Sequence, residues 1–167
     1  DLTDVNDFDE FKKKEKINDK DIEILVDICM LCNDTKFGEN KGSKTMLGDP
    51  TETALIYCGN KIGKNKEQME QEYTRIDEIP FDSNRKMMTT IHKIDNKYRI
   101  ITKGAPDVLL EKCVRQIGDT KNSTKILEKQ LIQRENLKMA EKALRVIAVA
   151  YKEVDNFINY IKYEFSN

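Results

Sequence analysis

Four short blocks of this sequence place acidic, aromatic and basic residues where they can bind a ligand. In the first block, Glu52 follows Asp49 by three residues. That spacing suits a capping-box partner at a helix start, and a carboxylate also accepts a hydrogen bond from an exocyclic amine. In the second block, Phe81 precedes Arg85 and Lys86. An aromatic beside a turn is normally a core anchor, but next to two cations it also suits stacking and anion binding.

The third and fourth blocks join a cation to the end of an apolar strand. Lys103 is followed by Gly104, whose missing side chain lets a ligand approach the backbone closely. The alternative for Lys103 is a solvated strand end before a turn. Arg145 precedes the apolar run 146–151, where its guanidinium suits a phosphate. Taken one at a time, each of the four blocks favours the purely structural alternative.

Other kinds of chemistry find little support. Two segments, 38–45 and 59–64, are similar to a phosphate-binding loop but have the wrong spacing and no preceding apolar strand. A single histidine and no G-x-S-x-G turn argue against a Ser/His/Asp hydrolase, and we predict no catalytic residue. Cys29 and Cys32 form a C-x-x-C without a second ligand pair. We therefore predict buried thiols in a reducing compartment and no metal site.

The composition indicates one polar domain. The chain has 167 residues, of which 35% are charged, with 29 basic against 30 acidic side chains. We expect a single domain over 1–167, with loosely ordered or hinge-proximal ends at 1–17 and 153–167. The charge balance argues against a nucleic-acid partner. No apolar run approaches the roughly 18 residues of a membrane helix, and the acidic start is unlike a secretion signal, so we expect no direct membrane contact.

The elements that must position the four blocks are helices and an antiparallel sheet. Apolar residues at helical spacing predict a helix over 19–33, and the cap signals at Asp49 and Pro50 predict one over 50–59. Pro106 starts an expected helix over 107–113, and charged helices are expected over 64–72 and 124–143. Alternation predicts a strand over 75–79, two strands over 88–94 and 98–103 flank a short polar turn, and an apolar run predicts the last strand over 145–151. Asn18 and Asp49 are the expected caps, Gly59 the expected end of the second helix, and 34–44 an exposed loop. A hairpin at 95–97 favours an α+β fold, a twisted antiparallel β-sheet flanked by helices.

Taken in order, the four blocks resemble the nucleotide-binding (N) domain of P-type cation-transporting ATPases, in the calcium-pump-like branch. Residues 48–55 resemble G-D/E-x-T-E-x-A-L, 81–88 resemble F-x-S/R-x-R-K-x-M, 103–107 resemble K-G-A-P-E, and 144–150 resemble L-R-V/C-L-A-x-A. The resemblance runs from Asp19 to Tyr151. It departs at Ser83, where some animal calcium pumps carry an arginine, and at Asp107, where glutamate is usual.

The resemblance implies an ATP site built from residues that match the family's positions, namely Glu52, Phe81, Lys86, Met88, Lys103, Gly104, Ala105, Arg145 and Ile147. In such a site Phe81 would stack on adenine and Glu52 would accept from its amino group. Lys103 would lie deep beside the purine, and Arg145 would reach the phosphates.

The remaining residues would shape the pocket. Lys86 would line it and Met88 would form part of its apolar floor. Gly104 and Ala105 would let the ring lie close to the backbone, while Ile147 would pack against the base or ribose.

The same resemblance implies a cytoplasmic domain of an integral membrane protein that binds ATP, as MgATP in the full pump. Its partners would be the phosphorylation and actuator domains of the same chain. The sequence lacks the family's D-K-T-G-T and T-G-E segments, so the isolated chain is expected to bind ATP without hydrolysing it. A non-catalytic interaction module of the same fold and a stand-alone hydrolase are the alternatives. Calcium is the transported ion that the motif wording favours.

Overall fold

The computed structural model describes residues 19–40, 43–118 and 124–156. The expected cap Asn18 and the expected loose ends, apart from 153–156, lie outside these ranges. The chain groups into two compact units, with the boundary in the sequence between Met69 and Glu70. The single domain therefore stays a prediction. Within the described ranges, none of the helices has the length and apolar character needed to span a bilayer.

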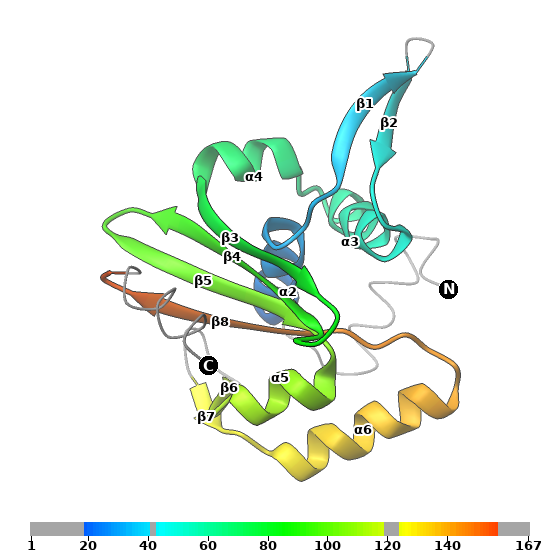
Figure 1. The fold of residues 1–167 in the computed structure, drawn as a ribbon, viewed down its shortest axis with the longest axis vertical. Helices are drawn as coiled ribbons and strands as arrows, with labels where there is room; N and C mark the ends of the chain where they lie inside the picture. The colour runs from blue at the N-terminus through cyan, green and yellow to red at the C-terminus, as the bar shows by residue number, and fades with distance from the viewer. Residues whose placement is uncertain (1–18, 41–42, 119–123, 157–167) are drawn as a thin grey trace. The chain divides into compact units, whose positions relative to one another are not determined.

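The first unit consists of two packed helices and a two-stranded ribbon (Figure 1). Its elements are α2 (Asp19–Leu31), β1 (Lys36–Asn40), β2 (Ser43–Leu47), α3 (Pro50–Lys61) and the start of α4 (Lys66–Glu72). Helices α2 and α3 contact each other, and Met30, Leu31 and Ile56 are completely or almost completely buried. The predicted helices are confirmed here, although each differs at its ends.

The exposed loop predicted over 34–44 is wrong, because most of it forms the ribbon. Strands β1 and β2 pair antiparallel, from Lys36 opposite Leu47 to Asn40 opposite Ser43. Within the part of the chain that the structure describes, the two strands pair only with each other, so neither needs the alternating apolar pattern that identifies a strand packed on a core. The polar, glycine-containing sequence therefore predicted a loop where the structure has two paired strands.

The end of α3 also differs from the prediction. The helix continues past Gly59 to Lys61, and Gly63, whose φ is +80°, follows the C-cap residue Ile62. The amide of Gly63 donates to the carbonyl of Asn60, and that of Lys64 donates to Gly59. These two bonds form a Schellman ending, in which the left-handed residue is the glycine. The earlier glycine is buried instead, and a Cβ there would lie 2.1 Å from the Met30 sulfur.

The second unit is built on a four-stranded antiparallel sheet with strand order β3-β4-β5-β8. The strands are β3 (Arg75–Asp82), β4 (Met87–Ile94), β5 (Lys97–Gly104) and β8 (Ala148–Val154). In the sequence, four elements separate β5 from β8, namely α5 (Pro106–Lys112), β6 (Arg115–Ile117), β7 (Thr124–Ile126) and α6 (Lys129–Glu141). Helix α5 contacts β5 and β8, and α6 contacts α5 (Figure 1). The predicted α+β class with an antiparallel sheet and flanking helices is confirmed.

Several predicted boundaries in this unit are wrong. Strand β3 continues past Ile79 to Asp82, and β8 continues past Tyr151 to Val154. The helix expected from Thr124 begins at Lys129, because 124–126 pair with β6. The last strand begins at Ala148 rather than Arg145. Its neighbour β5 supplies ladder partners only as far as Gly104, opposite Ala148, before the chain turns into α5. Residues ahead of Ala148 therefore have no strand to pair with.

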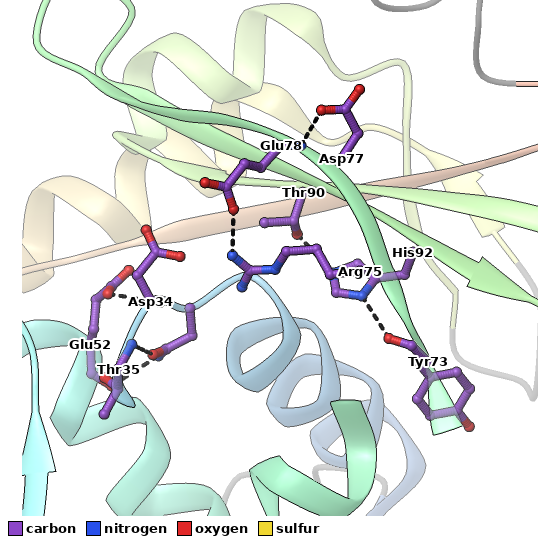
Figure 2. A network of polar contacts seen from close by, with 10 residues as sticks. Asp34, Thr35, Glu52, Tyr73, Arg75, Asp77, Glu78, Thr90 and His92 are labelled. Atoms are coloured by element: carbon purple, nitrogen blue, oxygen red, sulfur yellow. Dashed lines mark hydrogen bonds and ion pairs between the residues drawn. The ribbon is translucent and has the colours of Figure 1, made fainter. Parts of the chain in front are cut away.

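A buried histidine lies on the inner strand β4, opposite the first residue of β3. His92 is fully buried, with Nδ1 3.0 Å from the Tyr73 carbonyl oxygen and Nε2 3.0 Å from the Thr90 hydroxyl oxygen (Figure 2). A carbonyl can only accept, so Nδ1 carries the hydrogen, and in the neutral ring Nε2 accepts from Thr90. His92 thus has a structural role, joining β4 to the chain just ahead of β3.

Candidate functional site

Glu52 lies in the first turn of α3, in the first unit. The carboxylate of Asp49 caps this helix by accepting from the Thr51 amide at 2.8 Å, as predicted. The Oε2 atom of Glu52 accepts from the amide of Asp34 at 3.0 Å, and its carbonyl accepts from Asn33 Nδ2 at 2.9 Å (Figure 2). Glu52 therefore holds the segment that follows α2, a role that its place in the sequence does not indicate.

Lys103 is a buried residue of the sheet rather than a solvated strand end. It stands opposite Met88 on β4 and opposite Val149 on β8. Directly opposed residues of antiparallel strands point to the same face, so the lysine stem lies between these two apolar side chains. Lys103 is 7% exposed and Met88 is 2% exposed. The alternative of a solvated lysine is thus excluded by the structure.

Phe81 lies on the edge strand β3 and is 64% exposed. The pairing of β3 with β4 shifts between Ile79, opposite Thr89, and Asp82, opposite Met87. One extra residue on β3 makes a bulge, and Pro80, which has no amide hydrogen, fits such an interruption. An aromatic ring this exposed is not a core anchor. Its ring is available to stack on a ligand.

The turn after Phe81 brings Lys86 next to Gly104. Lys86 has a φ of +54°, and its carbonyl accepts from the amide of Ala105 at 3.0 Å. A Cβ on Gly104 would lie 2.5 Å from that carbonyl oxygen. The glycine is therefore required by the protein's own backbone, whether or not a ligand approaches it. The Lys86 ammonium is exposed and lies 3.9 Å from a carboxylate oxygen of Asp107, a loose surface pair.

Arg145 and Ile147 lie in the irregular segment between α6 and β8. Arg145 is exposed and Ile147 is half-buried. Ile147 directly precedes Ala148, the residue that pairs with Gly104. The predicted strand would have included Arg145. As part of a connection, it is less constrained than a residue of the sheet.

Eight of the nine predicted site residues belong to the second unit, and Glu52 belongs to the first. The eight lie at one end of the sheet, where the turn between β3 and β4 meets the end of β5 and the start of β8. The sequence prediction assigns no role to Asp82, which opens that turn. A sequence signal could have identified this residue, because aspartate at the first position of a turn commonly accepts hydrogen bonds from the amides two and three residues later. Within the described ranges, no group of three or more His, Cys, Asp or Glu residues is arranged to hold a metal ion.

Comparisons with known proteins agree on one family. A model of the family described as P-type ATPase, cytoplasmic domain N, matches residues 21–167. The Calcium-transporting ATPase 1 of Lactococcus lactis is 38% identical over 146 residues, which is 87% of this chain and 16% of that protein. The Calcium-transporting ATPase 1 of Bacillus cereus is 36% identical, covering 90% of this chain and 17% of that protein. The Calcium-transporting ATPase of Bacillus subtilis is 39% identical, covering 86% and 16%. This chain thus spans about a sixth of the length of these relatives.

Proposed function

Because this chain belongs to the family of P-type ATPase cytoplasmic N domains, we propose that it binds ATP and presents the γ-phosphoryl group to an aspartate on a neighbouring domain of a cation pump. The nine residues of the candidate site would bind the nucleotide. The phosphorylation and actuator domains of the full-length protein would be its partners, and calcium is the ion that the names of the three relatives favour.

The observation that carries the proposal is the buried Lys103 beside Met88, close to the exposed Phe81 at the same end of the sheet. A purine needs an apolar surface, a stacking partner and a few polar groups that fix its orientation. Met88 supplies apolar surface, Phe81 a stacking face, and the Lys103 ammonium a donor on an apolar stem.

The charged groups near this end suit the other half of the nucleotide. Lys86 and Arg145 are exposed cations, and exposed cations bind phosphates without the desolvation cost of buried ones. Magnesium would arrive with the phosphates, and the transfer itself depends mainly on positioning and electrostatics. No D-K-T-G-T segment occurs in this sequence, so the aspartate acceptor must come from elsewhere. We expect the isolated chain to bind ATP without hydrolysing it.

A calorimetric titration tests the proposal. The isolated chain should bind one ATP per molecule in the presence of either magnesium or EDTA. Inorganic triphosphate, which lacks the adenosine, should bind much more weakly, because Phe81, Met88 and Lys103 would have no base to contact. Folded protein that gives no heat with ATP would overturn the proposal. Phosphate release above the no-enzyme rate would contradict the expectation that the chain does not hydrolyse ATP.

A further inference from the structure

Asp82 organises the turn that links Phe81 to Lys86. Its Oδ1 atom accepts from the amide of Asn84 at 2.9 Å and from the amide of Arg85 at 2.8 Å. Its own carbonyl accepts from the amide of Lys86 at 2.7 Å. Three successive amides of the turn thus donate to a single residue. Without the carboxylate, two of these amides lose their acceptor within the chain.

The far end of the same turn is held by β5. Lys86 adopts a left-handed conformation, with φ +54°, which is unfavourable for a residue with a side chain unless the surroundings impose it. The amide of Ala105 donates to the Lys86 carbonyl, and Gly104 leaves room for that carbonyl. The position of Lys86 is therefore set by backbone contacts at both ends of the turn.

A side-chain brace supports the middle of the turn. The Nη2 atom of Arg85 donates to the Thr89 hydroxyl at 3.3 Å, and that hydroxyl lies 3.0 Å from the hydroxyl of Thr102. Arg85 is therefore held by Asp82 through its backbone and by β4 through its side chain. Phe81, in contrast, is largely exposed and gains little from packing. Its location depends on the backbone of the bulge and of the turn that follows.

From these contacts we propose that Asp82 is a positioning residue for nucleotide binding, acting as a backbone acceptor and not as a charge. The inference rests on the proposed function, since it concerns the residues on either side of the adenine and phosphate contacts. A negative charge at a phosphate-binding end of the sheet opposes the anion, so charge does not explain the residue. An acceptor oxygen one methylene from the backbone does explain it, and asparagine supplies the same oxygen.

The experiment compares Asp82→Ala with Asp82→Asn. Asp155→Ala is the matched control, because Asp155 is an exposed aspartate at the opposite end of the sheet. It directly follows Val154, the last residue of β8, which pairs with Tyr98. In nucleotide-free protein, amide hydrogen exchange at Asn84 and Arg85 should speed up in Asp82→Ala and stay near wild type in Asp82→Asn. ATP affinity should fall about tenfold in Asp82→Ala, the effect of losing a capping side chain. It should stay within about twofold in Asp82→Asn and in Asp155→Ala.

Several outcomes would overturn the inference. Wild-type affinity in Asp82→Ala would show that the turn does not position the site. Equal loss in Asp82→Asn would show that the charge, or a metal ion held by it, is what matters, and repeating the titration in EDTA separates those two causes. If Asp82→Ala does not fold, Asp82→Gln replaces it, because its longer side chain misplaces the acceptor. A wild-type chain that binds no ATP overturns the proposed function, whereas wild-type binding with no effect at Asp82 overturns only the inference.

Discussion

Met88 and Lys103 stand directly opposite each other on β4 and β5, and both side chains are buried. Val149 stands on the other side of Lys103, so the lysine is enclosed by apolar neighbours on its own sheet. The stem of Lys103 packs within the sheet, and in the proposed function its ammonium group binds the nucleotide.

Replacing Lys103 by methionine separates the two roles. Lys103→Met keeps the length of the stem and removes the ammonium group. We expect ATP affinity to fall about 10- to 150-fold, the range for losing a hydrogen bond from a charged group. The free energy of unfolding should change less than the free energy of ATP binding, because methionine keeps the apolar stem beside Met88. Titration calorimetry and urea unfolding measure the two quantities.

Lys97 provides the control for that experiment. It is an exposed lysine at the other end of β5, opposite Ile94. Lys97→Met should leave both ATP affinity and stability close to those of the wild type. Equal affinities in Lys103→Met and Lys97→Met would remove Lys103 from the nucleotide site.

Phe81→Ala should weaken ATP binding with little effect on folding. The ring is 64% exposed, so its removal exposes little new apolar surface, and surface substitutions usually change stability by about 0.5 kcal/mol or less. Stacking of one base on an aromatic ring contributes about 1–3 kcal/mol, or a 5- to 150-fold change in affinity. Leu137→Ala on α6, where the side chain is 60% exposed, is the matched control and should leave ATP binding unchanged. Parallel losses in both variants would indicate a general effect of removing surface apolar groups.

The sheet could be predicted from the sequence because its signals are local. The hairpin of β4 and β5 has two runs of strand-forming residues on either side of a short polar turn, and the structure confirms it. The burial of Lys103 could not be predicted in the same way. It depends on Met88 and Val149, which become its neighbours only through the pairing of three strands. Without the register of these strands, a lysine followed by glycine is equally compatible with a solvent-exposed strand end.

Other parts of the site were hidden for a similar reason. Gly104 is recognisable as a conformationally free residue, but the atoms that exclude a side chain there are the carbonyl oxygen of Lys86, in the turn before β4, and the Cγ of Met87. The hydrogen bond from the Asp34 amide to the Glu52 carboxylate joins two segments that are separated in the sequence by the β1–β2 ribbon. The family resemblance thus supplied the candidate site residues, while the contacts that hold them in place required the fold.

The four cysteines should divide into two reactivity classes. Cys29 and Cys32 are buried, whereas Cys58 and Cys113 are partly exposed, and burial raises the pKa of each of the latter two thiols. The thiolate is the reactive form, so iodoacetamide should modify Cys58 and Cys113 more slowly than free cysteine near pH 8.5. Their rates should keep rising above the pH at which free cysteine levels off.

Peptide mapping by mass spectrometry measures this division. Cys29 and Cys32 should be modified only after the protein is unfolded in urea. If native Cys32 reacts as fast as Cys58, the segment at the end of α2 opens in solution. A stoichiometric amount of zinc in the purified protein would contradict the interpretation of the C-x-x-C as buried thiols.

Gly104→Ala should disturb both folding and nucleotide binding. The added Cβ would lie 2.5 Å from the Lys86 carbonyl oxygen and 3.0 Å from the Met87 Cα, so backbone atoms must move. Such overpacking costs about 1–3 kcal/mol. The movement shifts Lys86, and we expect ATP affinity to fall along with the melting temperature.

Gly63→Ala distinguishes this effect from the general cost of replacing a glycine. Gly63 has a φ of +80° just after α3, and no atom other than those of its chain neighbours lies within 4 Å of a Cβ added there. Its replacement costs only backbone strain, about 1–2 kcal/mol, and should lower the melting temperature without changing ATP affinity in the folded protein. If Gly104→Ala behaved in the same way, with lower stability and wild-type affinity, then the contact between Gly104 and Lys86 would serve the fold alone. A loss of affinity in Gly104→Ala and not in Gly63→Ala would assign that contact to the nucleotide site.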